Sequence, residues 1–338
     1  MILGIETSCD ETAAAVVSDD ATIQADVVWS QQEVHTRFGG VVPELASRRH
    51  IETIDQVVRE ALARAGTTAQ DLDAVAVTAG PGLIGALLVG VAYGKALAYA
   101  CGLPIVAVNH LEGHLSAASL CAAPVAPPFV ALIVSGGHTS LYHVKNWNRT
   151  ELVGQTLDDA AGEAFDKAAT MLGLGYPGGP HIDRLAKEGH PERACFPKPY
   201  PTLADLNFSF SGLKTALLYY LRDQAQAGKS YQIADLAAGY QHAIVEVLVD
   251  KTLTAAARLG VQDIVVTGGV AANSALRARF LEEGLTRGCR IHIPSSAHCT
   301  DNAAMIAVAG LRLLREGRTA GLACEPQAQW TLGDERPG

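Results

Sequence analysis

Two histidines in the segment HLEGH, His110 and His114, have a spacing that could hold a metal ion. Side chains four positions apart on a helix lie one turn apart on the same face, so both imidazole rings can reach one ion. A pair of surface histidines would have the same spacing. The HExxH pattern of zinc proteases is absent, because Leu111 follows the first histidine and Glu112 lies on another helical face. We therefore expect a metal site without the general base of such a protease.

A metal site of this kind needs a third ligand, and the segment HCTDNAAMIA offers Asp301 near the start of a helix. Thr300, Asp301 and Asn302 could also each cap that helix, which is the more ordinary role for these residue types. Two histidines and one carboxylate leave coordination positions open for a substrate, as a catalytic iron or zinc ion requires. If the three side chains converge, we expect an open site.

Glycine pairs occur in three separate segments. Gly136–Gly137 lies in SGGHT between two predicted strands, Gly178–Gly179 lies in the loop GYPGGP, and Gly268–Gly269 follows a buried strand. Successive glycines let backbone N–H groups approach a phosphate, although hairpin turns and loops use glycine for other reasons. The repetition favours a nucleotide site. The P-loop pattern GxxxxGK[ST] is absent from the sequence.

Polar side chains near these glycines could contact the rest of a nucleotide. Asp166 and Glu163 lie on a predicted helix, from which a carboxylate can accept hydrogen bonds from ribose hydroxyls, and Asp183 is similar. The alternative for these acids is a solvated helix face that includes Lys167. Asn273 could contact a ligand or cap the helix that follows it.

The elements that must position these residues occur twice. Short apolar runs separated by polar turns predict strands at residues 2–6, 13–17 and 22–29. The same arrangement returns at residues 129–134 and 140–144, followed by a third run, ELVGQ. Three consecutive hairpin-linked strands at the amino terminus disfavour a doubly wound Rossmann fold. The chain is therefore predicted to contain one unit twice.

Each set of strands is followed by helices and by a buried strand that runs into glycines, at residues 74–82 and 263–274. A strand, a glycine turn and a helix N-terminus commonly present N–H groups to phosphate. Two such halves predict an α/β fold of the duplicated actin-like, sugar-kinase-like ATPase type, with two domains around a nucleotide cleft. We expect the first domain at 1–110, with a C-terminal helix at 302–330 packing back on it, and the second at 111–301.

Composition agrees with an ordered, two-domain globular protein, since 49% of the 338 residues are hydrophobic and 18% are charged. The net charge of -9 would repel a phosphate backbone, so a role with nucleic acid needs a local basic patch or a basic partner. Arg48, Arg49 and His50 form a small basic cluster, which we interpret as solvated surface.

The sequence also bears on location. Seven scattered cysteines without a Cys-x-x-Cys pair indicate a reducing compartment. Glu6 and Asp10 lie where a signal peptide would need a basic residue and an apolar run. The apolar stretch at 82–94 is too short and too rich in glycine to span a bilayer, so we interpret it as a buried helix. We expect a cytoplasmic protein with no membrane contact.

Ten segments carry a family resemblance, and they follow one another through almost the whole chain: GIETSCDET, GGVVPELASRRH, TAGPGLIGALLVG, HLEGH, VSGGHT, AGEAFDKAA, YPGGP, FSFSGLKTA, GGVAANS and CTDNAAMIA. Together they closely resemble the universal tRNA N6-adenosine threonylcarbamoyltransferase family, whose bacterial member was once labelled a glycoprotein endopeptidase. Each segment agrees with the predicted architecture, so the match is specific.

The resemblance implies an activity. A threonylcarbamoyl group passes from threonylcarbamoyl-AMP to N6 of adenosine 37 in tRNAs reading codons that begin with A, and AMP is released. It implies that His110, His114 and Asp301 hold one divalent metal ion, for which we expect Fe²⁺ in preference to Zn²⁺. It further implies an adenylate site at Ile133, Val134, Ser135, Gly136, Gly137, Asp166, Gly179, Asp183 and Asn273.

Roles for a base and for partners complete the expectation. We hypothesise that Asp10 or Glu11, in the first turn, helps to remove the proton from N6. The resemblance implies two partner proteins, a catalytically inactive paralogue and a small ATPase. The alternative function is a carbamoyltransferase of the same fold that acts on a protein or small molecule, although such relatives usually carry an additional domain. A non-catalytic scaffold is disfavoured, because all three candidate ligands are present.

Overall fold

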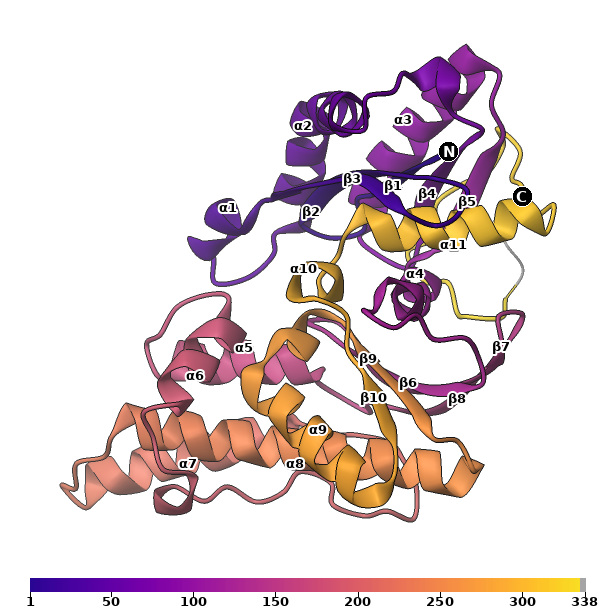
Figure 1. Ribbon diagram of the computed structural model, residues 1–338. Helices are drawn as coiled ribbons and strands as arrows, with labels where there is room; N and C mark the ends of the chain where they lie inside the picture. Colours follow the sequence, from indigo (N-terminus) through magenta and orange to yellow (C-terminus); the bar gives the residue numbers. More distant parts are fainter. Residues whose placement is uncertain (335–338) are drawn as a thin grey trace. The chain divides into compact units, whose positions relative to one another are not determined.

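The computed structural model describes residues 1–334 and forms two compact units (Figure 1). The first unit is Met1–Leu120 together with the segment that begins at Asp301, and the second is Cys121–Thr300. The predicted boundary after residue 110 falls inside the first unit, because helix α4 (His110–Ser116) packs on helix α11 (Ala303–Arg315). The second unit is therefore one continuous segment between two parts of the first.

A mixed five-stranded sheet, in the order β3-β2-β1-β4-β5, forms the centre of the first unit. β1 pairs antiparallel with β2 and parallel with β4, and every residue of β1, β4 and β5 is buried. Strands that are covered on both faces need continuous apolar sequences, which these three have. The strands span Ile2–Glu6 (β1), Glu11–Val17 (β2), Ile23–Ser30 (β3), Ala74–Gly80 (β4) and Ile105–Asn109 (β5).

Helices cover both faces of this sheet. Leu3 and Ile5 of β1 join a core with α2 and α3, whereas Ile2 lies on the opposite face with α11. The remaining helices of the unit are short. The helices are α1 (Gln32–Thr36), α2 (Pro43–Arg64), the 3-10 turn η1 (Ala69–Asp71), α3 (Ile84–Cys101), α4, the 3-10 turn η2 (Ala117–Leu120) and α11.

Helix α3 is longer than the apolar stretch from which it was predicted. It continues through Lys95 to Cys101, and by length and composition it is the one helix among residues 1–334 that could cross a membrane. The sequence interpretation was wrong on its length, because the alanine-rich segment KALAYAC extends the helix beyond residue 94. The expectation of a buried helix was also wrong, because only 33% of α3 is buried. One face packs against β4 and α2, and the other is exposed.

The second unit repeats the sheet of the first. Its strand order is β10-β9-β6-β7-β8, with β6 antiparallel to β7 and parallel to β9, so β6 corresponds to β1 and β9 to β4. The predicted duplication is thus confirmed. The strands span Phe129–Val134 (β6), Thr139–Asn146 (β7), Arg149–Gln155 (β8), Asp263–Thr267 (β9) and Arg290–His292 (β10).

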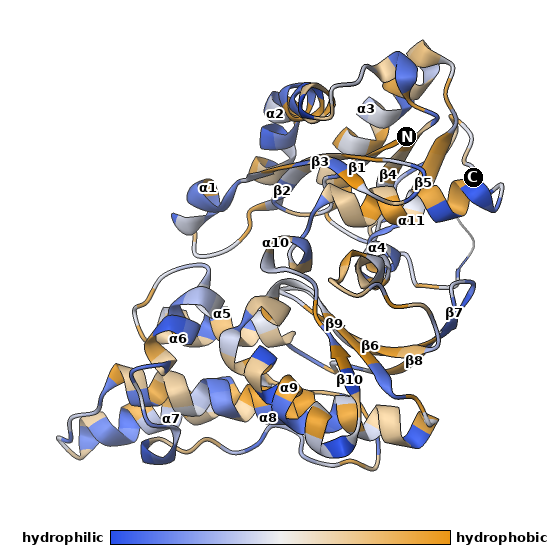
Figure 2. Cartoon of the chain, viewed as in Figure 1, coloured by the Kyte–Doolittle hydropathy of each residue, from blue (hydrophilic) through white to orange (hydrophobic). Residues whose placement is uncertain are grey.

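Helix α8 is the central helix of the second unit and is largely buried against the sheet and its neighbours. Figure 2 shows apolar residues along the strands β6 and β9, while polar residues are frequent on α7. The helices are α5 (Ala161–Met171), α6 (Gly178–Ala186), the 3-10 turn η3 (Pro191–Arg193), α7 (Ser211–Gln226), α8 (Ile233–Leu259), the 3-10 turn η4 (Gly269–Ala272), α9 (Ser274–Arg287) and α10 (Ser296–Cys299).

The C-terminal segment departs from the prediction of a helix over 302–330. Helix α11 ends at Arg315, since Gly317 adopts a left-handed conformation with φ of 72°. The chain then runs along the first sheet, where Ala320 forms a bridge with Ile105 and the Gln327 amide donates to the Ala79 carbonyl at 2.7 Å. This segment brings Trp330 back to the start of α4.

Candidate metal centre and glycine turns

Helix α4 carries both histidines and begins directly after strand β5. Asn109 caps it, because its side-chain oxygen accepts hydrogen bonds from the amides of Leu111 at 2.9 Å and Glu112 at 3.4 Å. The Asn109 amide group also donates to the Trp330 carbonyl at 2.9 Å. All seven residues of α4 are buried, so the helix is held in a fixed position by its cap and its packing.

His110, His114 and Asp301 come together in the first unit, and one ligand atom from each lies within 4.8 Å of the others. Asp301 Oδ1 lies 3.5 Å from His110 Nε2 and 3.2 Å from His114 Nε2. Both ring nitrogens of His114 are fully buried, yet neither makes a hydrogen bond. A buried imidazole nitrogen aimed at a carboxylate, without hydrogen-bond geometry, fits a shared metal ion.

The capping alternative for Asp301 is not what the structure has. Helix α11 is capped by the next residue, Asn302, whose side chain accepts a hydrogen bond from the Met305 amide at 2.9 Å. Asp301 therefore precedes the cap, and its carboxylate points to the histidines.

Glu6, at the end of β1, orients His110 from the opposite side of the ring. Its carboxylate lies 3.0 Å from His110 Nδ1 and accepts a 2.8 Å hydrogen bond from the Thr78 hydroxyl, and Glu6 is fully buried. Burial would raise the pKa of Glu6, but the charge and hydrogen bond of His110 lower it overall. Because an ionised carboxylate only accepts, His110 donates the N–H of Nδ1 to Glu6, and its Nε2 faces Asp301.

Further carboxylates crowd the same region. Burial, followed by the negative charges of Asp10 and Asp301, raises the pKa of Glu11 well above its usual value. Burial and the charges of Asp10 and Asp301 likewise raise the pKa of the Cys9 thiol. Clustered, partly buried carboxylates disfavour one another's ionised forms, and a divalent cation relieves this repulsion. The residues present therefore fit a metal ion.

Glu112 confirms the exclusion of a protease site. Its carboxylate pairs with Arg312 of α11 at 2.5 Å, and both side chains are largely buried. The ion pair turns Glu112 toward α11, so it is engaged away from the position that a protease base would need.

His50 was wrongly interpreted as solvated surface. It is fully buried, with Nδ1 2.7 Å from the Thr12 hydroxyl and Nε2 2.9 Å from the Cys9 carbonyl oxygen. Its neighbours behave as predicted, since Arg48 and Arg49 are exposed and pair with acids on the same helix. His50 thus fixes the β1–β2 turn that carries Asp10 and Glu11.

The turn after β6 in the second unit is open. Neither Gly136 nor Gly137 has a positive φ, and a Cβ at either position would meet no atom within 4 Å. Neither backbone conformation nor packing therefore requires these glycines, and the exposed turn leaves room for a ligand. Beside it, a Cβ on Gly162 would lie 2.6 Å from the Ser135 carbonyl oxygen, so the start of α5 packs directly on this turn.

The other glycine pairs join the same neighbourhood of the second unit. Gly268 has a φ of 95°, and a Cβ there would lie 2.4 Å from the Val134 carbonyl oxygen. Asp166 accepts a hydrogen bond from the Gly178 amide at 2.6 Å, which ties α5 to α6. Gly179 faces open space. One glycine of each later pair thus serves packing, and the second is free of steric contacts.

The remaining predicted site residues have structural partners. Asn273 caps α9 by accepting from the Leu276 amide at 2.9 Å, and its amide group donates to Gln241. Asp183 accepts from the Ser274 hydroxyl at 2.8 Å. Glu163 pairs with Lys167 at 2.9 Å on the helix surface, which is the alternative considered for it. The Asp183–Ser274 contact links α6 to the start of α9, and the Asn273–Gln241 contact links that start to α8.

Sequence reasoning missed Glu6, Thr78 and Arg312 as supports of the metal centre. The signal available for Glu6 was an acid that ends a fully apolar strand, since a buried carboxylate requires partners. Nothing in the local pattern connects Arg312 with Glu112, which is 200 positions away.

Known structures with the same fold include three that each cover 92–94% of this chain. Nucleotide-bound HypF has a TM-score of 0.59 at 14% identity, with 93% of this chain and 55% of HypF covered. A ROK hexokinase of Thermus thermophilus has a TM-score of 0.52 at 16% identity, with 94% and 99% covered. Component A of the Acidaminococcus fermentans (R)-2-hydroxyglutaryl-CoA dehydratase has a TM-score of 0.54 at 19% identity, with 92% and 97% covered. The chain thus has the duplicated α/β fold shared by the actin-like ATPases, and its first unit carries a candidate His₂Asp metal centre.

Within that class the family is specific. The family model described as "tRNA N6-adenosine threonylcarbamoyltransferase" matches residues 22–308. A relative of that name from Anaeromyxobacter dehalogenans (strain 2CP-C) is 56% identical over 332 residues, which are 98% of this chain and 99% of the relative. Another, from Clostridium perfringens (strain SM101), is 50% identical over 334 residues, with 99% and 98% covered. The chain belongs to the tRNA N6-adenosine threonylcarbamoyltransferase family.

Proposed function

We propose that this enzyme transfers the threonylcarbamoyl group from threonylcarbamoyl-AMP to N6 of adenosine 37 in tRNAs reading codons that begin with A, with release of AMP. The observation that carries the proposal is the His110–His114–Asp301 cluster in a chain whose full-length relatives have the name of this activity. A carbamoyltransferase for a protein or small molecule is not favoured. The relatives that carry the name of the tRNA-modifying activity match 98% of this chain.

The metal ligands in this proposal are His110, His114 and Asp301, and the ion is Fe²⁺ in preference to Zn²⁺. When bound, the ion supplies a positive charge and open coordination positions for a substrate oxygen. Glu6 holds the His110 ring so that Nε2 faces Asp301. Two imidazoles and one carboxylate suit either ion, so the preference is tested by metal analysis of protein purified without oxygen.

The adenylate in this proposal lies on the open glycine turns of the second unit. Exposed N–H groups at Gly136 and Gly137 would bind phosphate, and the uncrowded Gly179 would let the nucleotide approach α6. Asp166, Asp183 and Asn273 would act partly by holding α5, α6 and α9 together, since each is already bonded to a neighbouring helix or loop. Ile133 and Val134 are fully buried at the end of β6 and would act by holding the turn in place, whereas the partly exposed Ser135 begins the turn itself.

The attack on the carbamoyl carbon forms a bond from N6 and breaks the bond to the phosphate oxygen. N6 must lose a proton as this bond forms, and Asp10 or Glu11 would accept it. Both lie in the turn that His50 fixes, and Glu11 faces the charges of Asp10 and Asp301. The leaving phosphate would be retained by the glycine-turn amides.

The test compares Asp10→Asn and Glu11→Gln with Asp19→Asn, an exposed acid of the same unit. Each variant is incubated with partner proteins, threonylcarbamoyl-AMP and tRNA, and the modified nucleoside is measured. Loss of a general base lowers transfer about 10²–10⁴-fold while adenylate binding persists. Undiminished transfer by Asp10→Asn excludes Asp10 as the base, and absence of product with wild-type protein and active partners overturns the function.

Two partners complete the proposal, an inactive paralogue and a small ATPase, in the cytoplasm. What supports a protein partner is an apolar surface on α3, where Ile84, Leu88 and Tyr99 are 53%, 56% and 77% exposed. A Leu88→Asp variant should lose the paralogue in size-exclusion chromatography and retain its fold. Continued co-elution would remove α3 from the interface.

A further inference from the structure

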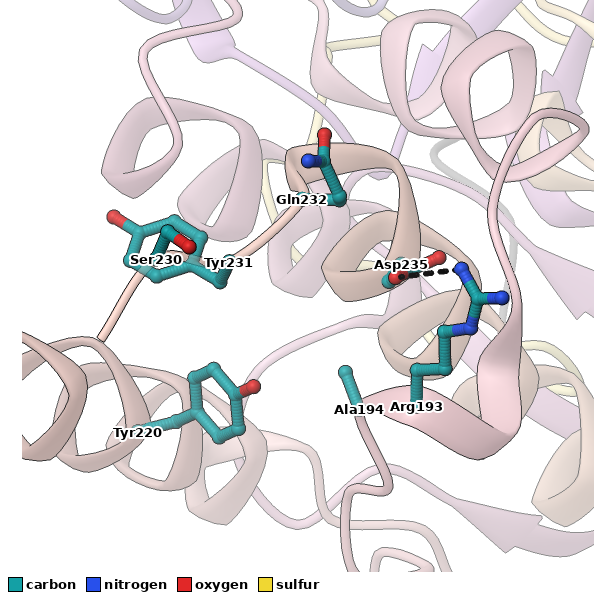
Figure 3. A pocket seen from close by; sticks show the side chains of 7 residues that line it. All are labelled: Arg193, Ala194, Tyr220, Ser230, Tyr231, Gln232 and Asp235. Atoms are coloured by element: carbon teal, nitrogen blue, oxygen red, sulfur yellow. Dashed lines mark ion pairs between the residues drawn. The ribbon is translucent and has the colours of Figure 1, made fainter.

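A small pocket lies in the second unit, apart from the glycine turns, where η3, the end of α7 and the start of α8 meet (Figure 3). Its volume of about 190 Å³ is below the roughly 300–1,000 Å³ typical of sites for drug-sized ligands. The pocket can therefore hold one small ring system. Figure 3 shows Tyr220 and Tyr231 on one side and Arg193 with Asp235 on the other.

The floor of this pocket is fixed by backbone packing. A Cβ on Gly189 would lie 2.0 Å from the Ala234 carbonyl oxygen, and one on Gly239 would lie 1.8 Å from that of Ala194. Both glycines therefore let the segment around η3 lie directly on the first turns of α8. The His190 amide adds a 2.8 Å hydrogen bond to Asp235. The pocket is thus formed without a ligand.

One wall is aromatic. The rings of Tyr220 and Tyr231 have centroids 6.4 Å apart and meet edge to face. Behind them, Phe196 lies 6.0 Å from Tyr220 and 5.6 Å from the buried Tyr240, so Tyr220 is held by a row of rings. Tyr231 is 40% exposed at the mouth and keeps a face available for stacking.

The opposite wall carries one positive and one negative group. Arg193 Nη1 lies 3.7 Å from Asp235 Oδ2, which exceeds hydrogen-bond distance, and the Arg193 side chain is 61% exposed. The guanidinium therefore has donors available. Ser230 and Gln232 add uncharged polar groups to the lining. Such a wall, neutral in sum but rich in donors and acceptors, suits the edge of a neutral heterocycle better than a lone phosphate, which Asp235 would repel.

We propose that this pocket binds one unpaired nucleobase of the RNA substrate, with the base against Tyr231 and its hydrogen-bonding edge toward Arg193 and Asp235. The inference rests on the proposed function, because it takes the ligand class from a tRNA-modifying family. Single-stranded RNA is recognised by stacking on aromatic side chains together with contacts to base edges. The second unit should also repel RNA less than the first unit does, since it contains 16 basic and 16 acidic residues.

The test measures KM for tRNA and kcat at saturating threonylcarbamoyl-AMP, with the complete set of partner proteins. Tyr231→Ala should raise KM about tenfold, the factor for roughly 1.4 kcal/mol of stacking, and leave kcat nearly unchanged. Tyr231→Phe should restore KM, because phenylalanine keeps the ring. Tyr219→Ala is the matched control, since Tyr219 is 51% exposed on α7 but stacks on Arg222 outside the pocket.

A second measurement links the pocket to one base. Anticodon stem-loop RNAs, each with one abasic position in the loop, are compared on wild type and Tyr231→Ala. One abasic position should raise KM on wild type and have no added effect on the variant. The proposal would be overturned if Tyr231→Ala and Tyr219→Ala raised KM equally. It would also be overturned if Tyr231→Ala and every abasic substitution raised KM additively. Modification of tRNA by wild type would still stand, so failure of the pocket and failure of the function are distinguishable.

Discussion

At the scale of single residues, the metal centre depends on a side chain that would not itself touch the ion. Glu6 holds the proton of His110 on Nδ1 and fixes the ring, while Thr78 holds Glu6. Outer carboxylates of this kind typically contribute 10–100-fold to metal affinity. We therefore expect Glu6→Gln to weaken binding of Co²⁺ to the metal-free protein within that range, as measured by titration against a competing chelator.

Glu112→Gln provides the control for this prediction. Glu112 lies on the same helix as the histidines and is also buried, but it pairs with Arg312 instead of a ligand. The variant should lose stability and keep its Co²⁺ affinity. Equal losses of affinity in both variants would mean that burial of any carboxylate near α4 matters, and not the hydrogen bond to His110.

Residue types and spacing predict the parts of the centre that are local in sequence. His110 and His114 are recognisable because a helix fixes their relation, and Asp301 because it precedes a helix start. The choice between Asp301 and Asn302 as the cap depends on backbone dihedral angles, which the sequence leaves open. Glu6 and His50 act through contacts with distant segments, so their roles require the tertiary structure.

At the scale of elements, the position of α11 on the first sheet depends on Gly4. A Cβ there would lie 2.5 Å from the Ala303 carbonyl oxygen and 2.7 Å from the Ala307 amide. Gly4→Ala should cost about 1–3 kcal/mol in the free energy of unfolding. Because α11 must shift and Asp301 directly precedes its cap, Asn302, metal affinity should fall as well.

Urea unfolding and chelator competition measure both effects of Gly4→Ala. Gly40→Ala serves as the control, because its Cβ would meet nothing within 4 Å and its φ is not positive. That variant should change stability by no more than about 0.5 kcal/mol. Normal metal affinity in a destabilised Gly4→Ala protein would show that α11 does not transmit the displacement.

The ion pair between Arg312 and Glu112 joins α11 to α4 in the first unit. Arg312→Met should destabilise the protein by about 3 kcal/mol or more, since it leaves a buried carboxylate without its cation. Adding Glu112→Gln should recover part of this loss. A double-mutant cycle by urea unfolding gives the coupling, and a value near zero would contradict the assignment.

The strands were the most predictable elements. Both three-stranded sets were expected from alternating apolar runs and polar turns, and β1, β6 and β9 lie within a residue or two of the expected positions. The extent of α3 and the end of α11 were not predictable, because packing on a sheet decides where such segments stop being helical. The sequence repeat was enough to predict that the two sheets are arranged alike, but it did not predict where the helices end.

At the scale of the whole molecule, one buried carboxyl makes stability depend on pH. Burial raises the pKa of Asp26 to about 6, although the amides of Ala303 and Ala304 act to lower it. A carboxyl whose pKa is raised on folding favours the folded state below its unfolded value near 4, and this contribution is lost as pH rises through 6. Asp26→Asn should therefore gain about 2 kcal/mol relative to wild type between pH 4 and pH 7.

Urea unfolding at four pH values between 4 and 7 measures this difference. Asp71→Asn provides the contrast, since hydrogen bonds from Thr68 lower the pKa of Asp71, and its variant should lose stability relative to wild type as pH rises. A pH-independent difference between wild type and Asp26→Asn would contradict the burial of Asp26 as an ionisable group.

Charge is distributed unevenly between the units. The second unit is neutral in sum, so the first carries the whole net charge of -9. The chain by itself should bind tRNA more weakly than the roughly 10⁻⁴–10⁻⁶ M of ordinary non-specific binding at physiological salt. Fluorescence anisotropy with labelled tRNA measures this affinity, and micromolar binding without partners would contradict it.

The order in which the ribosome makes the chain sets a limit on the metal centre. Asn109 and Trp330, which bond at the start of α4, are 221 positions apart, and Glu112 and Arg312 are 200 apart. At a synthesis rate of about 5–20 residues per second, roughly 10–40 s pass between synthesis of α4 and synthesis of the residues that hold it. The whole second unit is made in this interval and can fold. A chain whose synthesis stops before Asp301 lacks the third ligand of the cluster. Metal content should therefore distinguish full-length molecules from prematurely terminated ones.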